Sequence, residues 1–383
     1  MCDAVDRILF HSKLMKKIIL VFGTRPEAVK MCPLILELKK RKSMEVLVCL
    51  SGQHTDMTHS VLNEFGVDAD IDLCIMKNGQ TLFDVTEAVL KGVGDILKNN
   101  SPDVVLVHGD TTTAFATALS AYYSNIPVGH IEAGLRSGNI YEPFPEEFNR
   151  KAISLIAKYN FAPTLNAIQM LKTEGIKEES LFLVGNTVVD AVKYSMNTRF
   201  TSPLIDLASN KACMFLTAHR RENLGMTMRE MLMGVREAVD DIRDLYVIYP
   251  VHPNPLVRSV AHEVLGGHSR IIMTEPLGVR ETHNLIAKSR FIVTDSGGIQ
   301  EEAVSLGKRV LVMRRVTERP EGIEAGFIKL IGTDREAVRL EINKAYLADE
   351  GSSQRKSLNQ KNNPFGDGNA SKKIADVLEQ MIV

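Results

Sequence analysis

The sequence has almost no excess of charge and no long apolar run. Its 383 residues carry 46 Lys and Arg against 47 Asp and Glu, which gives a formal net charge of −1. A near-neutral chain offers no electrostatic case for binding nucleic acid or an anionic membrane. No apolar stretch approaches the ~20 residues that a membrane-spanning helix needs. We therefore expect a soluble globular protein with neither a nucleic-acid nor a membrane partner.

The sequence also lacks the spacings that mark redox and metal sites. None of its five cysteines belongs to a CxxC pair, and most fall in apolar segments. We expect reduced core thiols in a cytoplasmic protein. HxH, HExxH and clusters of Cys with His are absent, so we expect no metal site. The cysteines are Cys2, Cys32, Cys49, Cys74 and Cys213.

The first residues carry charge where a signal peptide would be apolar. Asp3 and Asp6 lie within the opening segment MCDAVDRILFHSKLMKK, which has no long apolar core. Met15 then begins MKKIILVFGTRP, which is typical of a natural start. We expect residues 1–15 to be an N-terminal extension or, before Met15, an artefact of the assigned start, and we assign them no function.

Short apolar runs alternate with longer amphipathic stretches along the whole chain. Continuous apolar runs predict strands of a parallel sheet that is covered on both faces. Residues 196–211 contain no strong strand signal and separate two such sets. The pattern predicts an α/β fold of two Rossmann-like, doubly wound parallel-sheet domains that face a central cleft. The predicted strands are KIILVFG, MEVLVCLSG, DVVLVHGD, IPVGHIEAG, YNFAPT and LFLVGN, and then ACMFLTAHR, LYVIYPVHPN, RIIMTEP, RFIVTDSG, RVLVMRR and GFIKLIG.

Polar motifs follow several of these runs directly. Because they come at the carboxyl ends of predicted parallel strands, we expect them to gather at the sheet edge where ligands of open α/β sheets bind. Amphipathic stretches between the runs predict helices, among them Ala28–Lys40, Thr113–Ser124 and, at the end of the chain, Ala370–Val383. The motifs are GTRPEA, HGDTTTA, HIEAG, TAHRREN, PVHPN and DSGGIQEE.

The segment TDSGGIQEEAVSLG, residues 294–307, places two glycines before two acids. Gly297 and Gly298 allow a close backbone approach, and a helix from about Ile299 would offer its amides and positive dipole end to a diphosphate. Glu301 and Glu302 would point about 100° apart on that helix, so one could reach past the phosphates to a ribose. An ordinary glycine-rich turn, with acids stabilising the helix start, explains the same residues. The spacing alone does not decide between the two.

The first strand is followed by two cations. Arg25 and Lys30 could bracket phosphate oxygens, with Pro26 starting the helix. A plain strand–helix turn with solvated cations is the alternative.

Several acids also follow strands or lie in loops. Asp110, Glu132, Glu146 and Glu147 in one cleft would suit proton transfer. The alternative for Asp110 is an N-cap of the helix beginning near Thr111. The acids are joined by His219, Arg220 and Arg221, which could hold and protonate a leaving phosphate. No GxGxxG fingerprint for a redox cofactor is present.

Together the motifs resemble the non-hydrolysing UDP-N-acetylglucosamine 2-epimerase family from about Lys16 to the C-terminus. The resemblance implies a fold like that of the B-type glycosyltransferases and a cytoplasmic homodimer that uses no cofactor. It implies an N-terminal domain of residues 16–190 with the catalytic carboxylates, a UDP-binding domain of residues 191–365, and a returning C-terminal helix, 366–383. The motifs that carry it are VFGTRPEAVKMCPL, LVHGDTTTAFATALSAYYSNIPVGHIEAGLRSG, PFPEEFNR, GNTVVDA, TAHRREN, YPVHPNP, TDSGGIQEEAVSLGKRVLVMR, TERPEGIEAG and NPFGDG.

The resemblance also implies residue roles. The acid/base carboxylates match Asp110, Glu132 and Glu146, and the histidine that helps the diphosphate leave matches His219. UDP-binding positions match Arg25, Ser296, Gly297, Gly298, Glu302 and Arg319, and further site positions match Lys30 and His252. A second, activating UDP-GlcNAc site would include Gln53, His54, Gln80 and Arg220.

The chain departs from the family pattern near these places. Thr55 and Asp56 replace a basic residue and a Gln or Glu, and Thr282 replaces an aromatic residue near the uracil. We therefore expect weak or altered activation by UDP-GlcNAc and an altered uracil affinity.

The implied activity is an isomerase that interconverts UDP-GlcNAc and UDP-ManNAc and supplies ManNAc units for cell-surface polysaccharide. UDP would be eliminated to leave 2-acetamidoglucal and would then add back. Three alternatives are a glycosyltransferase of the same fold, a hydrolysing UDP-GlcNAc 2-epimerase, and a non-enzymatic sensor of nucleotide sugars.

Overall fold

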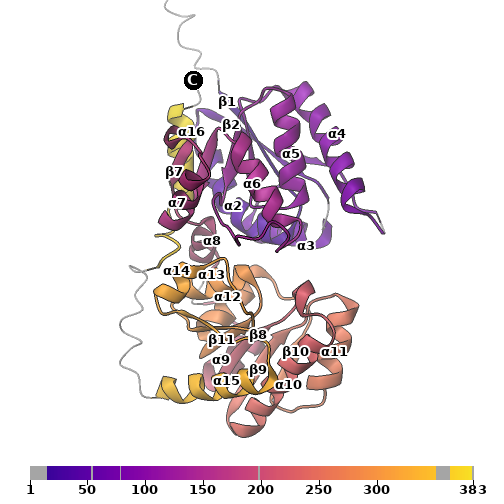
Figure 1. Cartoon of the computed structure of the whole chain (residues 1–383), viewed down its shortest axis with the longest axis vertical. Helices are drawn as coiled ribbons and strands as arrows, with labels where there is room; N and C mark the ends of the chain where they lie inside the picture. The colour runs from indigo at the N-terminus through magenta and orange to yellow at the C-terminus, as the bar shows by residue number, and fades with distance from the viewer. Residues whose placement is uncertain (1–14, 53–54, 78, 197–198, 351–362, 382–383) are drawn as a thin grey trace, which may run out of the picture. The chain divides into compact units, whose positions relative to one another are not determined.

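The chain forms two compact units, as a computed structural model that describes residues 15–52, 55–77, 79–196, 199–350 and 363–381 shows (Figure 1). The first unit runs to Asp190 and also includes the chain from Gly368 onward, and the second is Ala191–Asp367. The boundary after Asp190 falls within helix α8 (Thr187–Ser195).

The first unit is built on a seven-stranded sheet in the order β3-β2-β1-β4-β5-β6-β7. Every neighbouring pair is parallel. The strands are β1 (Lys16–Phe22), β2 (Met44–Leu50), β3 (Ile71–Asp72), β4 (Val104–His108), β5 (Val128–Ile131), β6 (Tyr159–Ala162) and β7 (Leu181–Leu183). The helices that lie wholly within it are α2 (Arg25–Lys39), α3 (Thr55–Phe65), α4 (Leu82–Asn100), α5 (Thr112–Tyr123), α6 (Glu146–Ile156), α7 (Leu165–Thr173), the 3-10 turn η1 (Glu178–Ser180) and α16 (Ala370–Met381).

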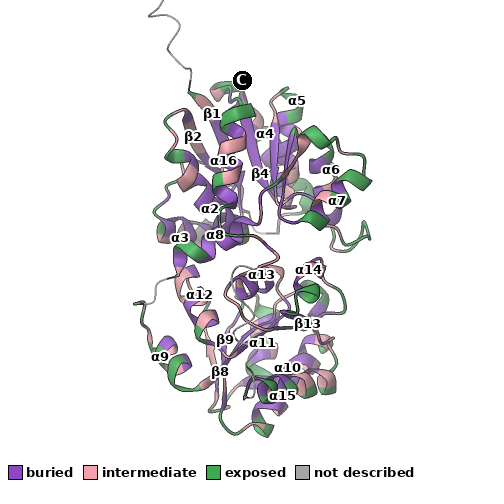
Figure 2. Cartoon of the chain, turned by 90° about the vertical axis from the view of Figure 1, so that its left-hand side faces the viewer, coloured by how far each residue is buried: buried purple, intermediate pink, exposed green. Residues whose placement is uncertain are grey.

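Both faces of this sheet are covered, which explains its continuous apolar strands. Ile19 and Val21 of β1 join one core cluster with residues of α4 and α5. The alternate residues of β1 are also fully buried, and α2 packs on β1 and β2. Side chains of a strand point alternately to the two faces. Figure 2 accordingly shows the central strands mostly in purple, with green mainly on the helices and loops outside them.

The second unit repeats this plan with a six-stranded parallel sheet in the order β10-β9-β8-β11-β12-β13. Its core joins the sheet to α10, α11 and α15. The strands are β8 (Ala212–Thr217), β9 (Leu245–Pro250), β10 (Ile271–Thr274), β11 (Phe291–Thr294), β12 (Val310–Val312) and β13 (Ile328–Leu330). The helices are α9 (Pro203–Asn210), η2 (Arg221–Asn223), α10 (Met226–Asp241), α11 (Pro255–Leu265), α12 (Val279–Lys288), α13 (Gly297–Ser305), α14 (Pro320–Glu324) and α15 (Arg335–Glu350).

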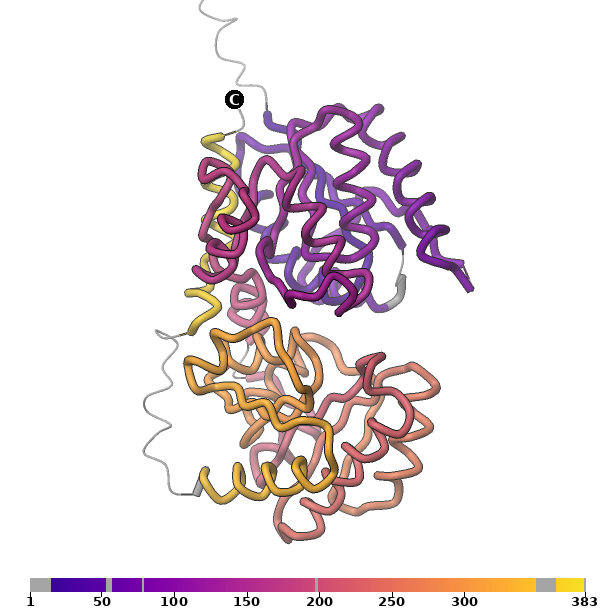
Figure 3. Tube along the Cα trace, viewed as in Figure 1, coloured from indigo at the N-terminus to yellow at the C-terminus, as the bar shows by residue number. Residues whose placement is uncertain are grey.

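The last helix belongs to the first unit, and Figure 3 shows it in yellow beside that unit. It packs on α2, and Arg41 pairs with Asp376 at 2.6 Å and with Glu379 at 2.9 Å. The start of α16 is held by Asp190, which accepts hydrogen bonds from the backbone N–H groups of Ala370 at 3.2 Å and Ser371 at 2.9 Å.

The fold class predicted from the sequence is confirmed by two all-parallel sheets. Each predicted apolar run is a strand, and the prediction missed β3, whose two residues are too short for a pattern. Cys32, Cys49 and Cys213 are buried thiols, whereas Cys74 is exposed. None of the helices in the described part of the chain combines the length and apolar character needed to cross a bilayer.

Two buried histidines of the first unit should make it sensitive to acid. Burial lowers the pKa of His108 from 6.5 to about 4 and that of His130 from 6.5 to about 3. The unfolded chain therefore binds more protons than the folded unit below pH 6.5, so stability falls as the pH falls from 6.5 toward 4. At pH 5 each histidine should cost up to about 2 kcal/mol relative to pH 7.

Urea unfolding followed by circular dichroism at pH 7 and pH 5 measures this loss. His130→Asn should be less stable at pH 7 and should lose roughly half as much stability on acidification, because one of the two titrating rings is gone. An equal loss in the variant and the unaltered protein would contradict the assignment to His130.

Candidate active site

The turn after β1 is organised by a buried carboxylate. Glu27 is 3% exposed, and its Oε2 accepts hydrogen bonds from the N–H groups of Gly23 at 3.1 Å and Thr24 at 2.8 Å. Its Oε1 accepts a hydrogen bond from the Thr111 hydroxyl at 2.7 Å, in the loop after β4. Burial raises the pKa of Glu27, and these hydrogen bonds oppose that rise. A β-carbon at Gly23 would lie 1.9 Å from the Ser51 hydroxyl oxygen, so a larger residue there would force Ser51 to shift. Arg25 is the first residue of α2 beyond this rigid turn.

Glu132 lies in a nearly closed polar cluster after β5. Lys30 Nζ hydrogen-bonds Glu132 Oε2, and Asn186 Nδ2 donates to the same oxygen at 2.9 Å. His108 Nε2 lies 3.8 Å from it. The side chains of Lys30 and Glu132 are only 7% and 9% exposed. Glu132 also has a φ of 65°, a left-handed conformation that a non-glycine residue rarely adopts without support from its surroundings. The structure thus places Lys30 on Glu132, a partner that the sequence did not indicate.

Asp110 is held by α6. Arg150 Nη2 donates to Asp110 Oδ2 at 2.6 Å, and Asn149 Nδ2 donates to the Asp110 carbonyl at 2.9 Å. Glu146 starts α6 and lies one turn before Arg150, so both project from the same face of that helix. Glu146 therefore lies on the face of α6 that carries Arg150, the partner of Asp110. The fully buried Glu147 faces Arg150 at 3.2 Å.

The alternative role considered for Asp110, as a helix N-cap, is wrong. Thr111 caps α5, and its side chain accepts a hydrogen bond from the Ala114 N–H at 3.0 Å. The hydroxyl one residue later satisfies the helix start, so the Asp110 carboxylate can pair with Arg150 instead.

In the second unit a buried aspartate organises the loop after β8. Asp295 is 0% exposed and accepts hydrogen bonds from the His219 N–H at 3.0 Å and the Arg220 N–H at 2.9 Å. The Asn223 side chain donates to it at 3.1 Å. The His219 ring stacks on the His252 ring, with centroids 5.2 Å apart. The two histidines that the sequence singled out therefore lie side by side.

The start of α13 is lined by a buried arginine. Ser296 precedes the helix, and a β-carbon at Gly297 would lie 2.9 Å from the Arg319 guanidinium. Arg319 Nε donates to Glu301 at 2.8 Å, and its Nη1 donates to Glu318 at 3.2 Å. Burial alone would raise the pKa of Glu318, but the hydrogen bond from Arg314 and the charges of Arg319 and Arg314 hold it well below its usual range.

The two adjacent acids of α13 have separate partners. Glu301 is buried against Arg319. Glu302 Oε2 lies 3.3 Å from His283 Nε2, and a β-carbon at Gly298 would lie 3.7 Å from Glu302 Oε1. Successive helical residues point about 100° apart, and this separates the two carboxylates.

In the part of the chain that the structure describes, the remaining positions predicted from the sequence make few contacts with the other predicted site residues. Gln80 donates to the Ile75 carbonyl at 2.5 Å, and the Arg220 side chain pairs with Glu222 at 3.1 Å. Gln53 and His54 lie outside the described residues, as do the side chains of Thr55 and Asp56. Thr282 is half-buried on α12. Within the described residues there is no group of three or more His, Cys, Asp or Glu side chains placed to hold a metal ion.

Sequence reasoning missed the residues that hold the predicted ones. The spacing of Thr24 and Glu27 is a capping-box signal that could have revealed one of them. The others carry no local signal, because their partners are distant in the chain. The missed residues are Glu27, Arg150, Asn186, Ser195, His283 and Asp295.

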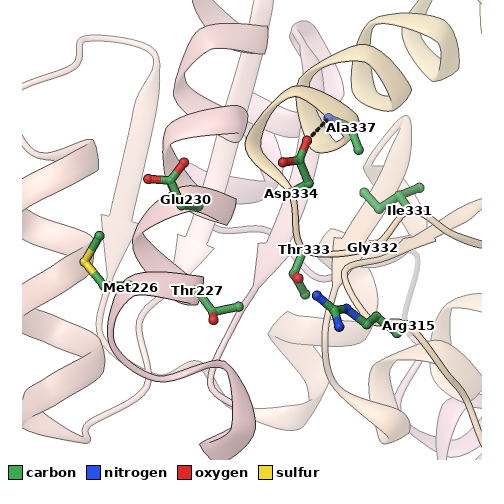
Figure 4. A pocket seen from close by; sticks show the side chains of 9 residues that line it. All are labelled: Met226, Thr227, Glu230, Arg315, Ile331, Gly332, Thr333, Asp334 and Ala337. Carbon is green, nitrogen blue, oxygen red and sulfur yellow. Dashed lines mark hydrogen bonds between the residues drawn. The ribbon is translucent and has the colours of Figure 1, made fainter.

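A cavity of about 420 Å³ in the second unit lies apart from this set (Figure 4). It lies between Met226 and Thr227 at the start of α10 and the segment Gly332–Asp334 before α15, with Arg315 beside it. None of the site residues predicted from the sequence lines it.

Comparison with known proteins gives consistent matches over nearly the whole chain. Residues 36–379 match the family model described as UDP-N-acetylglucosamine 2-epimerase. The UDP-N-acetylglucosamine 2-epimerase of Bacillus subtilis (strain 168) is 49% identical over 362 residues, which cover 94% of each chain. That of Salmonella typhimurium is 43% identical over 372 residues, which cover 95% of this chain and 98% of the other.

Solved structures agree with these matches. A UDP co-structure of S. aureus MnaA is similar with a TM-score of 0.88 and 45% identity, covering 96% of each chain. A UDP-GlcNAc 2-epimerase from Neisseria meningitidis bound to UDP-GlcNAc has a TM-score of 0.88 and 39% identity, covering 95% of this chain and all of the other, 100%.

Asp295 provides a test of how the second unit is organised. Asp295→Asn replaces one acceptor oxygen by an amide donor that faces backbone N–H groups, so the second unit should lose about 3 kcal/mol of stability. Hydrogen exchange of amides in β8 and β11 should rise, while exchange in β1 and β4 should not. Asp244→Asn, at an exposed position, is the matched control. Unchanged exchange in β8 would contradict the role given to Asp295.

Proposed function

Because the chain belongs to the UDP-N-acetylglucosamine 2-epimerase family, we propose that it interconverts UDP-N-acetylglucosamine and UDP-N-acetylmannosamine without net hydrolysis. The observation that carries the proposal is the set of three carboxylates after β4 and β5 and at the start of α6: Asp110, Glu132 and Glu146. Inverting C2 requires a proton to leave one face of the sugar and to arrive on the other, and a single acid/base group cannot serve both faces.

The reaction we propose begins with loss of UDP. The C2 proton of the substrate is not acidic, because no carbonyl is adjacent to it. When the C1–O bond breaks, its electron pair leaves with UDP, C1 becomes oxocarbenium-like, and a carboxylate removes the C2 proton. The products of this step are 2-acetamidoglucal and UDP. A proton then reaches C2 from the opposite face, and a UDP oxygen re-forms the bond to C1.

The described residues supply fixed groups for both parts of this scheme. Asp110 is held by Arg150 and Glu132 by Lys30, which keeps each carboxylate in one place. For the departing diphosphate, the start of α13 offers the N–H groups of Gly297 and Gly298. His219 is placed through its backbone by Asp295 and can give a proton to the leaving phosphate. Arg25 and Arg319 are the proposed cations for UDP, and Lys30, Ser296 and His252 complete the proposed site.

We further propose a cytoplasmic homodimer that provides ManNAc units for cell-surface polysaccharide. The relatives bound to UDP and to UDP-GlcNAc support the choice of ligands. The scheme uses no redox cofactor, because neither the elimination of UDP nor its re-addition requires an oxidant or a reductant. A glycosyltransferase of this fold would need an acceptor and would yield no UDP-ManNAc from UDP-GlcNAc alone, and a hydrolysing epimerase would release free ManNAc.

Incubation with UDP-GlcNAc in D₂O tests the scheme. Each turnover refills C2 from a carboxyl group in exchange with solvent, so UDP-ManNAc should carry deuterium at C2, and UDP-GlcNAc should acquire it later. Proton NMR follows both sugars. Asp110→Asn, Glu132→Gln and Glu146→Gln should each slow turnover about 10²- to 10⁴-fold, whereas Glu142→Gln, an exposed acid of the same loop, should not. Product without deuterium would overturn elimination, and full activity in all three variants would overturn the site.

The adjacent acids of α13 make a matched pair for UDP binding. Glu302→Gln should weaken UDP binding about tenfold and leave the melting temperature near its original value, because a charged acceptor for the ribose is lost. Glu301→Gln should lower the melting temperature, because Glu301 is buried against Arg319. Calorimetric titration with UDP and thermal unfolding separate the two effects. Unchanged UDP affinity in Glu302→Gln would remove its ribose assignment.

A further inference from the structure

A buried histidine connects the proposed ribose carboxylate to the end of α8. His283, on α12, is 1% exposed, and Ser195, the last residue of α8, is 3% exposed. Ser195 Oγ hydrogen-bonds His283 Nδ1, and His283 Nε2 lies 3.3 Å from Glu302 Oε2. The three side chains therefore form a chain of contacts that ends on Glu302.

The acceptor character of a carboxylate determines how protons are arranged along this chain. Ionised Glu302 can only accept, so a hydrogen bond to it requires the proton of a neutral imidazole to be on Nε2. Nδ1 is then an acceptor, and Ser195 is the donor to it. Ser195 Oγ is also 3.2 Å from the Val192 carbonyl, but its one proton can serve only one of these acceptors. The arrangement thus holds the ring in one tautomer and one orientation.

The two oxygens of Glu302 have different surroundings. Oε2 faces His283, whereas Oε1 lies on the side of Gly298, in the first turn of α13. A carboxylate rotating freely about its last bond would exchange these oxygens. The 3.3 Å contact with a ring that is itself fixed by Ser195 opposes that rotation and favours one orientation of the carboxylate plane.

From this geometry we infer that His283 is the positioning residue of the nucleotide site and orients Glu302 to accept hydrogen bonds from the ribose hydroxyls, with Ser195 fixing the ring. The inference rests on the proposed UDP-binding function. On this inference, the preference for ribose over deoxyribose depends on the buried contact between His283 and Glu302 as well as on the Glu302 carboxylate itself.

Two substitutions of His283 separate the contacts of its two ring nitrogens. The Asn side chain places its amide nitrogen near the position of Nδ1, too far from Glu302 for a hydrogen bond. The longer Gln side chain places its amide nitrogen near the position of Nε2, from which it can still donate to Glu302. We expect His283→Asn to weaken UDP binding about tenfold and binding of 2′-deoxy-UDP much less, which lowers the preference for ribose. His283→Gln should keep most of that preference. His268→Asn, a histidine of the same unit bound to Asp240, is the control and should leave both affinities unchanged.

Calorimetric titrations with UDP and 2′-deoxy-UDP, together with thermal unfolding, provide the readouts. Ser195→Ala, a smaller change, should reduce the ribose preference to a lesser extent and serves if His283→Asn does not fold. His283→Asn should add little to the loss in Glu302→Gln, because both act on one interaction. An unchanged ratio of the two affinities in His283→Asn and Ser195→Ala, or equal ratios in His283→Asn and His283→Gln, would overturn the inference. Absence of UDP binding by the unaltered protein would overturn the proposed function as well.

Discussion

In each unit one buried carboxylate connects the loops that follow the two central strands, at the point where the strand order of the sheet reverses. In the first sheet the order reverses between β1 and β4, and Glu27 accepts hydrogen bonds from Thr24 after β1 and from Thr111 after β4. In the second the order reverses between β8 and β11, and Asp295 after β11 accepts the N–H of His219 after β8. Ligands of open α/β sheets bind at such points, because the flanking loops diverge there. The two carboxylates therefore fix the loops that a ligand would contact.

Charged side chains around the start of α13 differ in their surroundings. Arg319 pairs with Glu301 and Glu318, and these ion pairs hold its guanidinium beside the start of α13. A buried cation without such partners would pay the desolvation free energy with no ion pair to offset it. Glu302, one residue along the helix, faces His283 and the side of Gly298 instead. Neighbouring acids thus act differently because the helix turns them to different surroundings.

Helix α8 is the element on which proposed site residues of both units depend. Just before it, Asn186 donates to Glu132, and at its end Ser195 hydrogen-bonds His283, the partner of Glu302. The boundary between the units falls inside this helix. A conservative change at Asn186 would therefore alter the surroundings of Glu132, and one at Ser195 would act on the proposed nucleotide contact of Glu302 through His283.

The amino-acid sequence alone predicts the two parallel sheets, every strand except β3, the family, and the strand-end motifs that contain Asp110, His219 and Glu302. These follow from apolar periodicity and motif spacing, which are local properties of the chain. The partners of these polar side chains are visible only in the folded chain: Lys30 contacts Glu132, 102 residues away, and Ser195 contacts His283, 88 residues away. Polar pairing depends on distance in space and on burial, and neither quantity exists until the chain has folded.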